Sequence, residues 1–202
     1  MNVISVDKHR SLPAIAAKVF LARGIEEATI KEIASELGVG EATIYRHYKN
    51  KALLAILAAE HLQEDIMSSY FSHGTTLQGY EGLKAFYNVF VQVYENHPEY
   101  YRFLDEFDIF IANHSEGDTL SYEAGLDRFK DIYLSFYEKG VKDGTVQAID
   151  DVESFYFAST HATLSLCKKL ASQGVVPQDL RIDKVHELKV FIEMVLYRLE
   201  KK

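Results

Sequence analysis

The segment from Thr29 to Lys51, TIKEIASELGVGEATIYRHYKNK, constrains the fold of this chain most, because two short helical patterns meet there at a glycine. Thr29 and Glu32 have the spacing of a capping box, which begins a helix. Gly38 suits the left-handed conformation that commonly ends one. Between them, apolar residues recur at the spacing of a single buried helix face. These residues are Ile30, Ile33, Ala34 and Leu37.

A second short helix is predicted to begin at Gly40, with Glu41 in its first turn near the positive end of the helix dipole. The sequence Lys49-Asn50-Lys51 interrupts the apolar pattern, and a new helix follows it. A helix, a tight glycine turn and a short second helix form the helix-turn-helix layout, in which the second helix enters the major groove of DNA. The sequence therefore predicts a DNA-binding segment near the N-terminus.

These residues resemble the tetracycline-repressor (TetR) family of transcriptional regulators across residues 9–57, about a quarter of the chain. The matching positions are Ala16-Ala17, Phe20, Gly24, Thr29, Ile33-Ala34, Gly38-Val39, Thr43-Ile44-Tyr45, Tyr48 and Lys51-Ala52-Leu53. Two positions depart from the family pattern. Gly40 stands where members usually carry Ser, Thr or an acid, and Pro13 stands where the first helix is usually aliphatic. Because proline fits only the first turn of a helix, we expect that helix to begin near Ser11 or to be kinked there.

The resemblance implies a set of DNA-contact residues. The expected backbone contacts are Thr43, Tyr45, His47 and Lys51, and the groove-facing positions are Glu41, Ala42 and Arg46. Two further candidates are Gly40, at the start of the second helix, and Lys31, whose place on the first helix of the pair suits contact with either a base edge or a phosphate. Hydroxyl and ammonium groups suit phosphate oxygens, which position a protein without reading sequence. An arginine can bind both O6 and N7 of guanine, so Arg46 is the expected specificity residue. Alternatively, the rings of Tyr45 and Tyr48 cover the small core of this segment, and Lys49 is expected in solvent.

The charge is distributed unevenly along the chain. The formal net charge is -8, but residues 1–51 hold eight Lys or Arg and six acidic residues, which gives +2 there and leaves -10 for the rest. This asymmetry places nucleic acid at the N-terminal segment. The charge therefore predicts a DNA-binding domain over residues 1–51, and the resemblance implies an effector-binding and dimerisation domain over residues 52–202. A net charge of only +2 also implies that tight binding needs two copies.

The chain beyond residue 51 is predicted to be helical throughout, which makes an all-α protein of about nine helices, with an N-terminal three-helix bundle and a larger C-terminal helical domain. The predicted helices cover residues 51–72, 80–96, a segment opened by Pro98, a long segment ending at 143, 150–172 and 183–199. Asp150 and Glu153 resemble a second capping box, and Asp183 is the expected cap of the last helix. Loops are expected at 73–76 and 115–117, with Gly174 and Pro177 ending the helix before the last.

The last two helices carry the pattern of a dimer bundle. One helix has a narrow apolar stripe with alternating steps of three and four residues, and the preceding helix has small residues that allow close approach. The predicted interface residues are Ala158, Ala162, Ser165, Val185, Leu188, Ile192, Val195 and Leu199. By periodicity alone, an intramolecular core explains the stripe equally well. The family resemblance implies a homodimer, in which two recognition helices meet a pseudo-palindromic DNA site.

Aromatic residues are concentrated between residues 80 and 160. Because the chain has no Trp, these rings must fill most large core positions, and core packing is the simplest interpretation of each of them. The resemblance implies instead a cavity for a small hydrophobic or aromatic-compatible effector. The candidate pocket residues are Tyr87, Asn88, Phe107, Asp108, Tyr133, Phe136 and His161. The expected function is a repressor that such an effector releases from DNA, with the helix that begins at Lys51 as the lever.

Several other classes of protein are disfavoured. The eight histidines show no metal-binding spacing, and the chain has no glycine-rich phosphate loop and no GxSxG elbow, so we expect no enzyme, metal or cofactor. A single cysteine, Cys167, excludes an intrachain disulfide and fits a reducing cytoplasm. No apolar run is long enough for a membrane span, and the N-terminus lacks the apolar stretch of a signal peptide. The alternatives are a ligand-independent DNA-binding regulator and a helical protein-interaction module.

Overall fold

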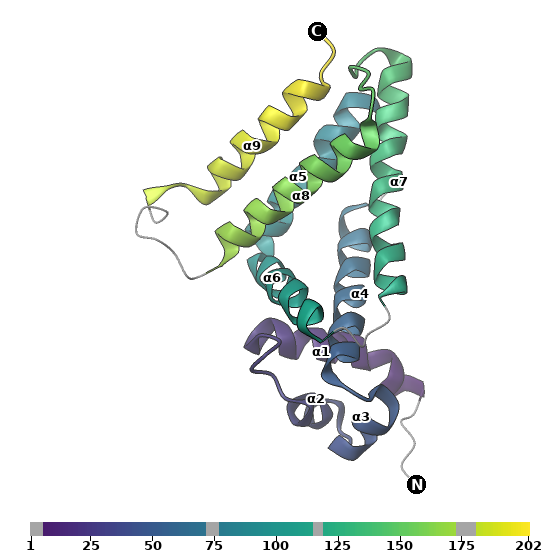
Figure 1. The fold of residues 1–202 in the computed structure, drawn as a ribbon, viewed down its shortest axis with the longest axis vertical. Helices are drawn as coiled ribbons and strands as arrows, with labels where there is room; N and C mark the ends of the chain where they lie inside the picture. The colour runs from purple at the N-terminus through teal and green to yellow at the C-terminus, as the bar shows by residue number, and fades with distance from the viewer. Residues whose placement is uncertain (1–5, 72–76, 115–118, 173–180) are drawn as a thin grey trace. The chain divides into compact units, whose positions relative to one another are not determined.

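The computed structural model describes residues 6–71, 77–114, 119–172 and 181–202. Those residues form nine α-helices and no β-strand, which confirms the all-α prediction (Figure 1). The helices are α1 (Val6–Arg23), α2 (Ile30–Leu37), α3 (Glu41–Tyr48), α4 (Lys51–Tyr70), α5 (Gly79–Asn96), α6 (Pro98–Asn113), α7 (Leu120–Asp143), α8 (Val152–Ala171) and α9 (Lys184–Leu199). None of these described helices is both long and apolar enough to cross a bilayer.

The chain divides into two compact units. The first, here called the head, consists of residues 1–67 and 102–125; the second, here called the body, consists of residues 68–101 and 126–202. Three helices, α4, α6 and α7, therefore continue from one unit into the other. The head thus holds residues from the middle of the chain, and the functional boundary predicted at residue 51 stays a prediction.

The start and end of α2 follow the sequence signals. The Thr29 hydroxyl accepts a hydrogen bond from the Glu32 N–H at 3.2 Å, and the Glu32 carboxylate accepts one from the Thr29 N–H at 2.9 Å. This pair is the predicted capping box. At the other end, Gly38 has a φ of 67° and its N–H bonds the last carbonyls of the helix, as predicted. Buried side chains of α1, α2 and α3 form the core here, among them Leu12, Phe20, Ile33 and Ile44.

Of the two alternatives predicted for the first helix, the start near Ser11 was wrong, whereas the kink stays a prediction. The helix begins at Val6 rather than near Ser11, and Pro13 lies inside it. A proline there removes one backbone N–H donor from the helix. Leu12 and Ala16 on either side of it have no exposed surface. Burial of such side chains in the head core offsets the lost hydrogen bond, so tertiary packing extends the helix past the position where local preference ends it.

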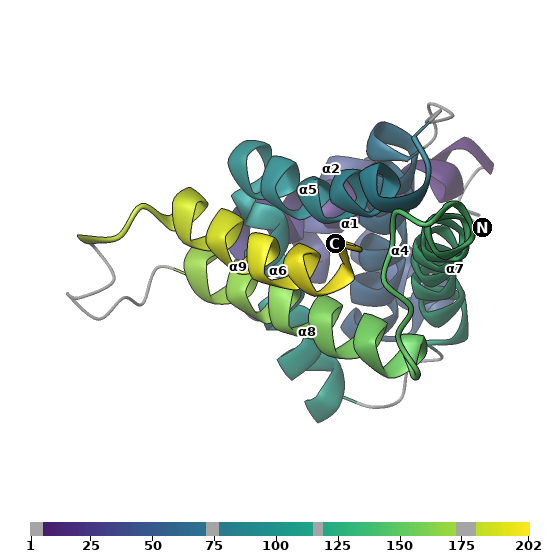
Figure 2. The same cartoon turned by 90° about the horizontal axis from the view of Figure 1, so that it is seen from above.

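In the body, α5, α8 and α9 pack on one another, and Figure 2 shows them side by side. The Asp183 carboxylate accepts hydrogen bonds from two N–H groups at the start of α9, which confirms the predicted cap. At α8 the cap is Asp151, which accepts from the Ser154 N–H at 2.9 Å. The predicted capping box at Asp150 was therefore wrong by one residue, because two adjacent aspartates carry the same local signal.

Two glycines allow α5 and α7 to cross closely. A Cβ atom added to Gly140 would lie 2.9 Å from the Cα atom of Gly79, and it would also meet the side chain of Val146. Val146 forms a bridge to Glu200, so the residues after α9 lie against the connection between α7 and α8. The predicted loops at 73–76 and 115–117, and the predicted helix end at Gly174 and Pro177, lie outside the described residues.

Candidate nucleic-acid interface

One face of α3 is exposed to solvent along its whole length. Its residues follow the steps of one, three and one that place side chains together on a helix. They are Glu41, Ala42, Tyr45 and Arg46, and the exposed Lys49 follows as the C-cap. On the opposite face, Ile44 has no exposed surface and Thr43 is only 9% exposed. The helix therefore has an inner side that fixes it in the head and an outer side that is available to a partner.

The ends of α3 are fixed by neighbouring segments. Gly40 precedes the helix, and its carbonyl accepts from the Thr43 N–H at 2.9 Å. The Lys8 ammonium of α1 donates to the Gly38 carbonyl at 2.6 Å, which holds the turn before α3. After α3, the Asn50 side chain accepts from the Leu53 N–H at 2.9 Å and so fixes the start of α4. The turn and both helix ends thus orient the exposed face of α3.

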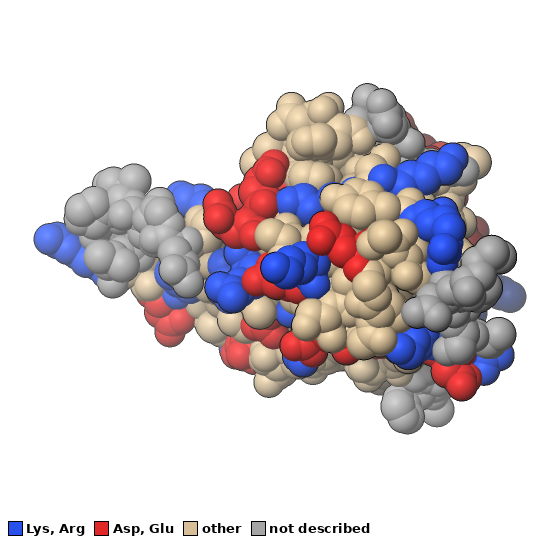
Figure 3. Space-filling view, turned by 90° about the horizontal axis from the view of Figure 1, so that it is seen from below, with Lys and Arg blue, Asp and Glu red and all other residues tan. Residues whose placement is uncertain are grey.

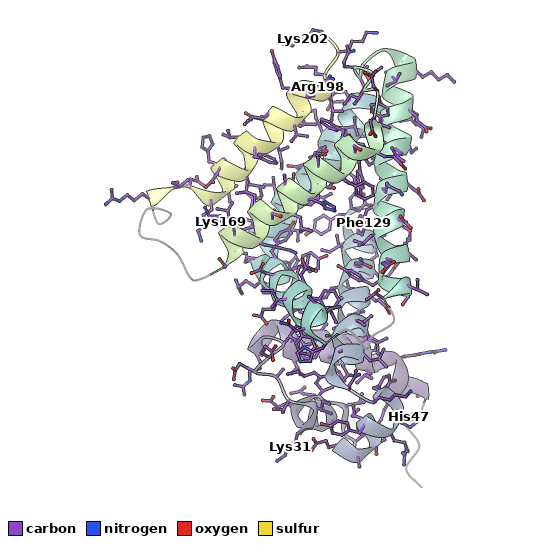
Figure 4. All side chains as sticks on the ribbon, viewed as in Figure 1. Lys31, His47, Phe129, Lys169, Arg198 and Lys202 are labelled. Atoms are coloured by element: carbon purple, nitrogen blue, oxygen red, sulfur yellow. The ribbon has the colours of Figure 1, made fainter. Side chains whose placement is uncertain are left out.

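The nine predicted DNA-contact residues fall into two groups. Six are exposed on α2, on α3 or just before α3, namely Lys31, Gly40, Glu41, Ala42, Tyr45 and Arg46. Figure 4 shows Lys31 on α2 and His47 on α3. The other three are less accessible, since Thr43 is nearly buried and His47 and Lys51 are half-buried. Tyr48, the expected alternative core residue, is also half-buried, and burial raises the pKa of its hydroxyl.

Lys51 has a structural partner that sequence reasoning missed. Its ammonium donates to the carbonyl of Glu26 at 2.8 Å and to that of Ala28 at 3.2 Å, and lies 5.4 Å from the ring centre of Phe110. An ammonium group has three N–H donors, so one remains for another acceptor such as a phosphate. The acceptors are backbone carbonyls, which carry no residue-specific signal, so the sequence could not reveal this contact.

The same connection between α1 and α2 is held by α6. The Glu106 carboxylate accepts a hydrogen bond from the Ile25 N–H at 2.6 Å. Nearby, Phe103 of α6 stacks on Phe20 of α1 with ring centres 6.5 Å apart. The C-terminal part of α6 therefore belongs to the core of the head. The sequence could not reveal this, because α6 lies far from α1 and α2 along the chain.

Several basic residues of the head are already paired with acids. Lys18 contacts Glu36 at 3.0 Å, and Arg23 contacts Glu32 at 3.3 Å. The surface in Figure 3 accordingly shows Lys and Arg side chains interspersed with Asp and Glu rather than one continuous basic area. This mixture fits the small net charge of the N-terminal segment. Few exposed positions of the described head therefore remain for an anionic partner, and the exposed face of α3 and Lys31 are among them.

The predicted pocket residues do not all come together. Tyr87 and Tyr133 lie in the body core with ring centres 6.1 Å apart, and Phe136 is half-buried on α7 in the same unit. Phe107 instead packs in the head between Phe103 and Tyr122, at 5.8 and 5.2 Å between ring centres. The remaining candidates are exposed, namely Asn88, Asp108 and His161. Of the seven residues, Tyr87 and Tyr133 are the pair that shares a buried site.

The predicted dimer residues also separate into two groups. On α8, Ala158, Ala162 and Ser165 are exposed, as a contact with a partner requires. On α9, the stripe lies against α5 and α8, where Leu188, Ile192 and Leu199 are buried and Val185 and Val195 are half-buried. Leu188 and Leu199 have no exposed surface and Ile192 is only 6% exposed, so these three side chains pack within the chain, which corrects their assignment to a dimer contact. The exposed apolar residues nearby are Phe157, Val190, Met194 and Tyr197.

Comparison with known proteins gives one family. The family model described as "Bacterial regulatory proteins, tetR family" matches residues 14–57. The chain is 25% identical over 152 residues to the HTH-type transcriptional repressor KstR2 of Rhodococcus jostii, covering 69% of this chain and 68% of that protein. It is 39% identical over 46 residues to an HTH-type transcriptional regulator of Staphylococcus aureus, covering 23% of this chain and 25% of that one.

Solved structures resemble the whole fold. The ketosteroid transcriptional regulator KstR2 of Mycobacterium tuberculosis superposes with a TM-score of 0.64 at 16% identity, covering 99% of each chain. A tetR-family regulatory protein from Rhodococcus has the same TM-score at 17% identity, covering 98% of this chain and 100% of that one. At these identities the likeness establishes the fold, and the matches to the α1–α4 segment carry the information on function.

Proposed function

Because this chain is a transcriptional regulator of the TetR family, we propose that it binds a pseudo-palindromic operator as a homodimer, represses transcription there, and is released by a small-molecule effector. The exposed face of α3 is the observation that carries the proposal. In this proposal residues 1–51 make the DNA contacts, and residues 52–202 supply the dimer contact and the effector site. The named repressor among its relatives supports repression rather than activation.

The face of α3 suits recognition of a G·C pair. Arg46 can donate to O6 and N7 of guanine, and Glu41 can accept from the N4 amino group of cytosine. Both side chains are exposed, at the two edges of the outer face of the helix. Tyr45, 49% exposed, and Lys31 offer a hydroxyl and an ammonium group to phosphate oxygens. The remaining N–H of Lys51 could do the same without breaking its two carbonyl contacts.

The proposed dimer contact combines the exposed faces of α8 and α9. Val190, Met194 and Tyr197 recur at steps of four and three on α9, and they are 40%, 66% and 62% exposed. Ala158 and Ala162 on α8 are small enough to let a second pair of helices approach. A two-fold dimer formed there would present two copies of α3 to successive major grooves, roughly 34 Å apart.

We further propose that α4 and α6 transmit the state of the effector site. Both helices continue from the body into the head, and both hold the connection between α1 and α2, through Lys51 and Glu106. A ligand that favours one position of these helices would change the orientation of the helix pair α2–α3. It can do so only to the extent that it binds one state more tightly than the other.

The test is DNA binding with a selected sequence. Double-stranded DNA that binds the full chain is selected from a random pool, and its affinity is measured by fluorescence anisotropy against a scrambled duplex. Arg46→Ala should cost about 1–3 kcal/mol on the selected site and much less on the scrambled one. Arg181→Ala, an exposed arginine of the body, serves as the control. Equal losses on both duplexes for Arg46→Ala would contradict base recognition by this residue.

The dimer is tested by sedimentation. Met194→Asp places a charge in the proposed contact and should convert the dimer to a monomer, with weaker operator binding as a result. Ile109→Asp is the matched control, because Ile109 is 60% exposed but lies on α6 in the head. A wild-type protein that sediments as a monomer at all concentrations would contradict the dimer.

A further inference from the structure

A buried hydroxyl group in the body has no hydrogen-bond partner. Tyr133 of α7 has no exposed surface, and its hydroxyl finds no partner among the described residues. Three rings surround it, those of Phe86, Tyr87 and Tyr156, with centres 5.4, 6.1 and 5.0 Å from its own. Buried polar groups in proteins are nearly always hydrogen-bonded, so an orphaned hydroxyl requires an explanation.

The neighbouring hydroxyl groups show which kind of partner is missing. The Ser159 hydroxyl donates its single proton to a backbone carbonyl, that of Phe155 at 2.6 Å. Ser159 also contacts the Tyr87 hydroxyl at 2.7 Å, so the Tyr87 hydroxyl has a hydrogen-bond partner within the chain. The Tyr133 hydroxyl has none among the described residues. The Tyr133 O–H is therefore a hydrogen-bond donor that an acceptor atom of a bound molecule would satisfy.

The Tyr133 hydroxyl stays protonated near neutral pH. Burial raises its pKa far above the ordinary value, and the adjacent Tyr87 raises it further, although the two hydroxyl groups do not meet the geometry of a hydrogen bond. Burial also raises the pKa of Tyr87 and of Tyr156 to about 12. The group is therefore a neutral donor within aromatic walls.

The surroundings disfavour a charged ligand. The carboxylates of Asp127 and Asp131 lie close enough to raise the pKa of Tyr156, so they would also repel an anion placed beside it. The nearby cation Lys130 is paired with Asp127 at 3.4 Å. A cation would be attracted by these carboxylates and rings, but it has no acceptor atom for the Tyr133 proton. A neutral molecule meets neither obstacle.

Half-buried rings connect this group with the surface. Phe71, at the end of α4, lies 5.8 Å from Phe86 and 5.6 Å from Phe129 of α7, measured between ring centres. Phe129 is labelled in Figure 4, and both Phe71 and Phe129 are half-buried. An apolar molecule that displaces or slides between such rings exchanges water for aromatic contacts on its way to Tyr133.

We propose that the Tyr133 hydroxyl is the hydrogen-bond donor that anchors the effector, and that the effector is a neutral, mainly apolar molecule with a carbonyl oxygen as its acceptor. This inference rests on the effector-controlled function proposed above. The Tyr133 hydroxyl is the anchoring group of the effector site, and because it donates a proton, the effector must carry a hydrogen-bond acceptor.

The test uses a matched pair of probes, the ketone tetralone and its parent hydrocarbon tetralin, which differ by the carbonyl group. Isothermal titration calorimetry with the full-length protein should show tetralone binding about five- to tenfold more tightly than tetralin. Tyr133→Phe should lower the affinity for tetralone to that for tetralin and leave the affinity for tetralin unchanged. Its unfolding temperature should equal or exceed that of the wild type, because the substitution removes an unpaired buried group.

Tyr137→Phe is the control variant. Its hydroxyl accepts a hydrogen bond from the Ile149 N–H at 2.7 Å, so it has a partner within the chain, and the preference for tetralone should persist. Equal affinity of the wild type for both probes, binding of neither, a preference that survives Tyr133→Phe, or a strong loss of stability in that variant would each overturn the inference. Operator binding by the wild type without a probe is measured separately. Its failure would contradict the proposed function, whereas the probe results bear only on Tyr133.

Discussion

The buried aromatic residues of the head are phenylalanines, whereas those of the body are mainly tyrosines. Those of the head are Phe20, Phe103, Phe107 and Phe110, and those of the body are Phe86, Tyr87, Tyr94, Tyr101, Tyr133, Tyr137 and Tyr156. Phenylalanine adds apolar surface without a polar atom, so the head core needs no internal partners. Each buried tyrosine of the body brings a hydroxyl group that must be satisfied.

The body satisfies most of these hydroxyl groups from within. Tyr94 donates to the Leu170 carbonyl and Tyr101 to the Phe90 carbonyl, each at 3.0 Å, and Tyr87 bonds Ser159. Tyr133 differs from its neighbours because it has no such partner among the described residues. The aromatic residues of the head core thus contribute apolar packing alone, whereas the body core contains one buried hydroxyl group, that of Tyr133, without a hydrogen-bond partner among the described residues.

The largest effect is expected from truncating a ring of the head. Phe107→Ala should lower the free energy of unfolding by about 3–5 kcal/mol, because Phe107 is 3% exposed and a cavity would replace its ring. Chemical denaturation followed by circular dichroism measures this change. Ile109→Ala, on the same helix but 60% exposed, should change it by less than about 0.5 kcal/mol. Similar effects of the two substitutions would show that α6 does not fill the head core.

The second effect concerns the contact between the start of α4 and the connection between α1 and α2, all within the head. Lys51→Ala should lower the free energy of unfolding by about 1–3 kcal/mol, because two backbone carbonyls lose a charged donor. It should also weaken binding to all DNA, selected or scrambled. Lys49→Ala removes an exposed lysine two residues away and should leave stability nearly unchanged. A loss of DNA affinity without loss of stability would indicate that Lys51 acts on phosphate alone.

A smaller effect on stability is expected to distinguish Tyr94 from Tyr133 in the body. Tyr94→Phe should cost about 0.5–1.5 kcal/mol of stability, because it removes the donor to the Leu170 carbonyl in a buried site. Tyr133→Phe should cost nothing in the same denaturation experiment. If both substitutions destabilise the protein equally, the two hydroxyl groups are equally satisfied, and the distinction within the body core disappears.

The smallest effect is a pH dependence in the head. Hydrogen bonds from the backbone N–H and the hydroxyl of Thr29, with a smaller contribution from Arg23, lower the pKa of the Glu32 carboxyl. A carboxyl whose pKa is lower in the folded state stabilises the protein above its unfolded pKa, and this stabilisation is lost as the pH falls through the folded pKa. Thermal unfolding of wild type and Glu32→Gln should therefore differ at pH 7 and converge below about pH 4. A difference that stays constant across this range would exclude the carboxylate as the cause.

Local signals in the sequence predicted the helix-turn-helix well. The capping box at Thr29, the glycine end at Gly38 and the cap at Asp183 each depend on neighbours within a few residues, so the sequence is sufficient for them. Predictions based on distant contacts did less well. The stripe that includes Leu188 has the correct periodicity, but periodicity cannot say whether the same chain or a second copy covers an apolar face. Phe107 likewise sits in a helix whose two ends belong to different units.

The close crossing of α5 and α7 at Gly79 and Gly140 predicts how this protein would tolerate random mutation. Substituting either glycine pushes the two helices apart, because an added Cβ atom at Gly140 lies 2.9 Å from the Gly79 backbone and one at Gly79 lies 3.2 Å from the Gly140 backbone, besides the side chains that each would meet. Once that separation exists, a second Cβ atom at the crossing meets less backbone, while the cost of a side chain at the φ of 60° of Gly79 is unchanged. In a library of double variants the two positions should therefore show strong positive epistasis, with the pair of alanines costing far less than the sum of the single substitutions.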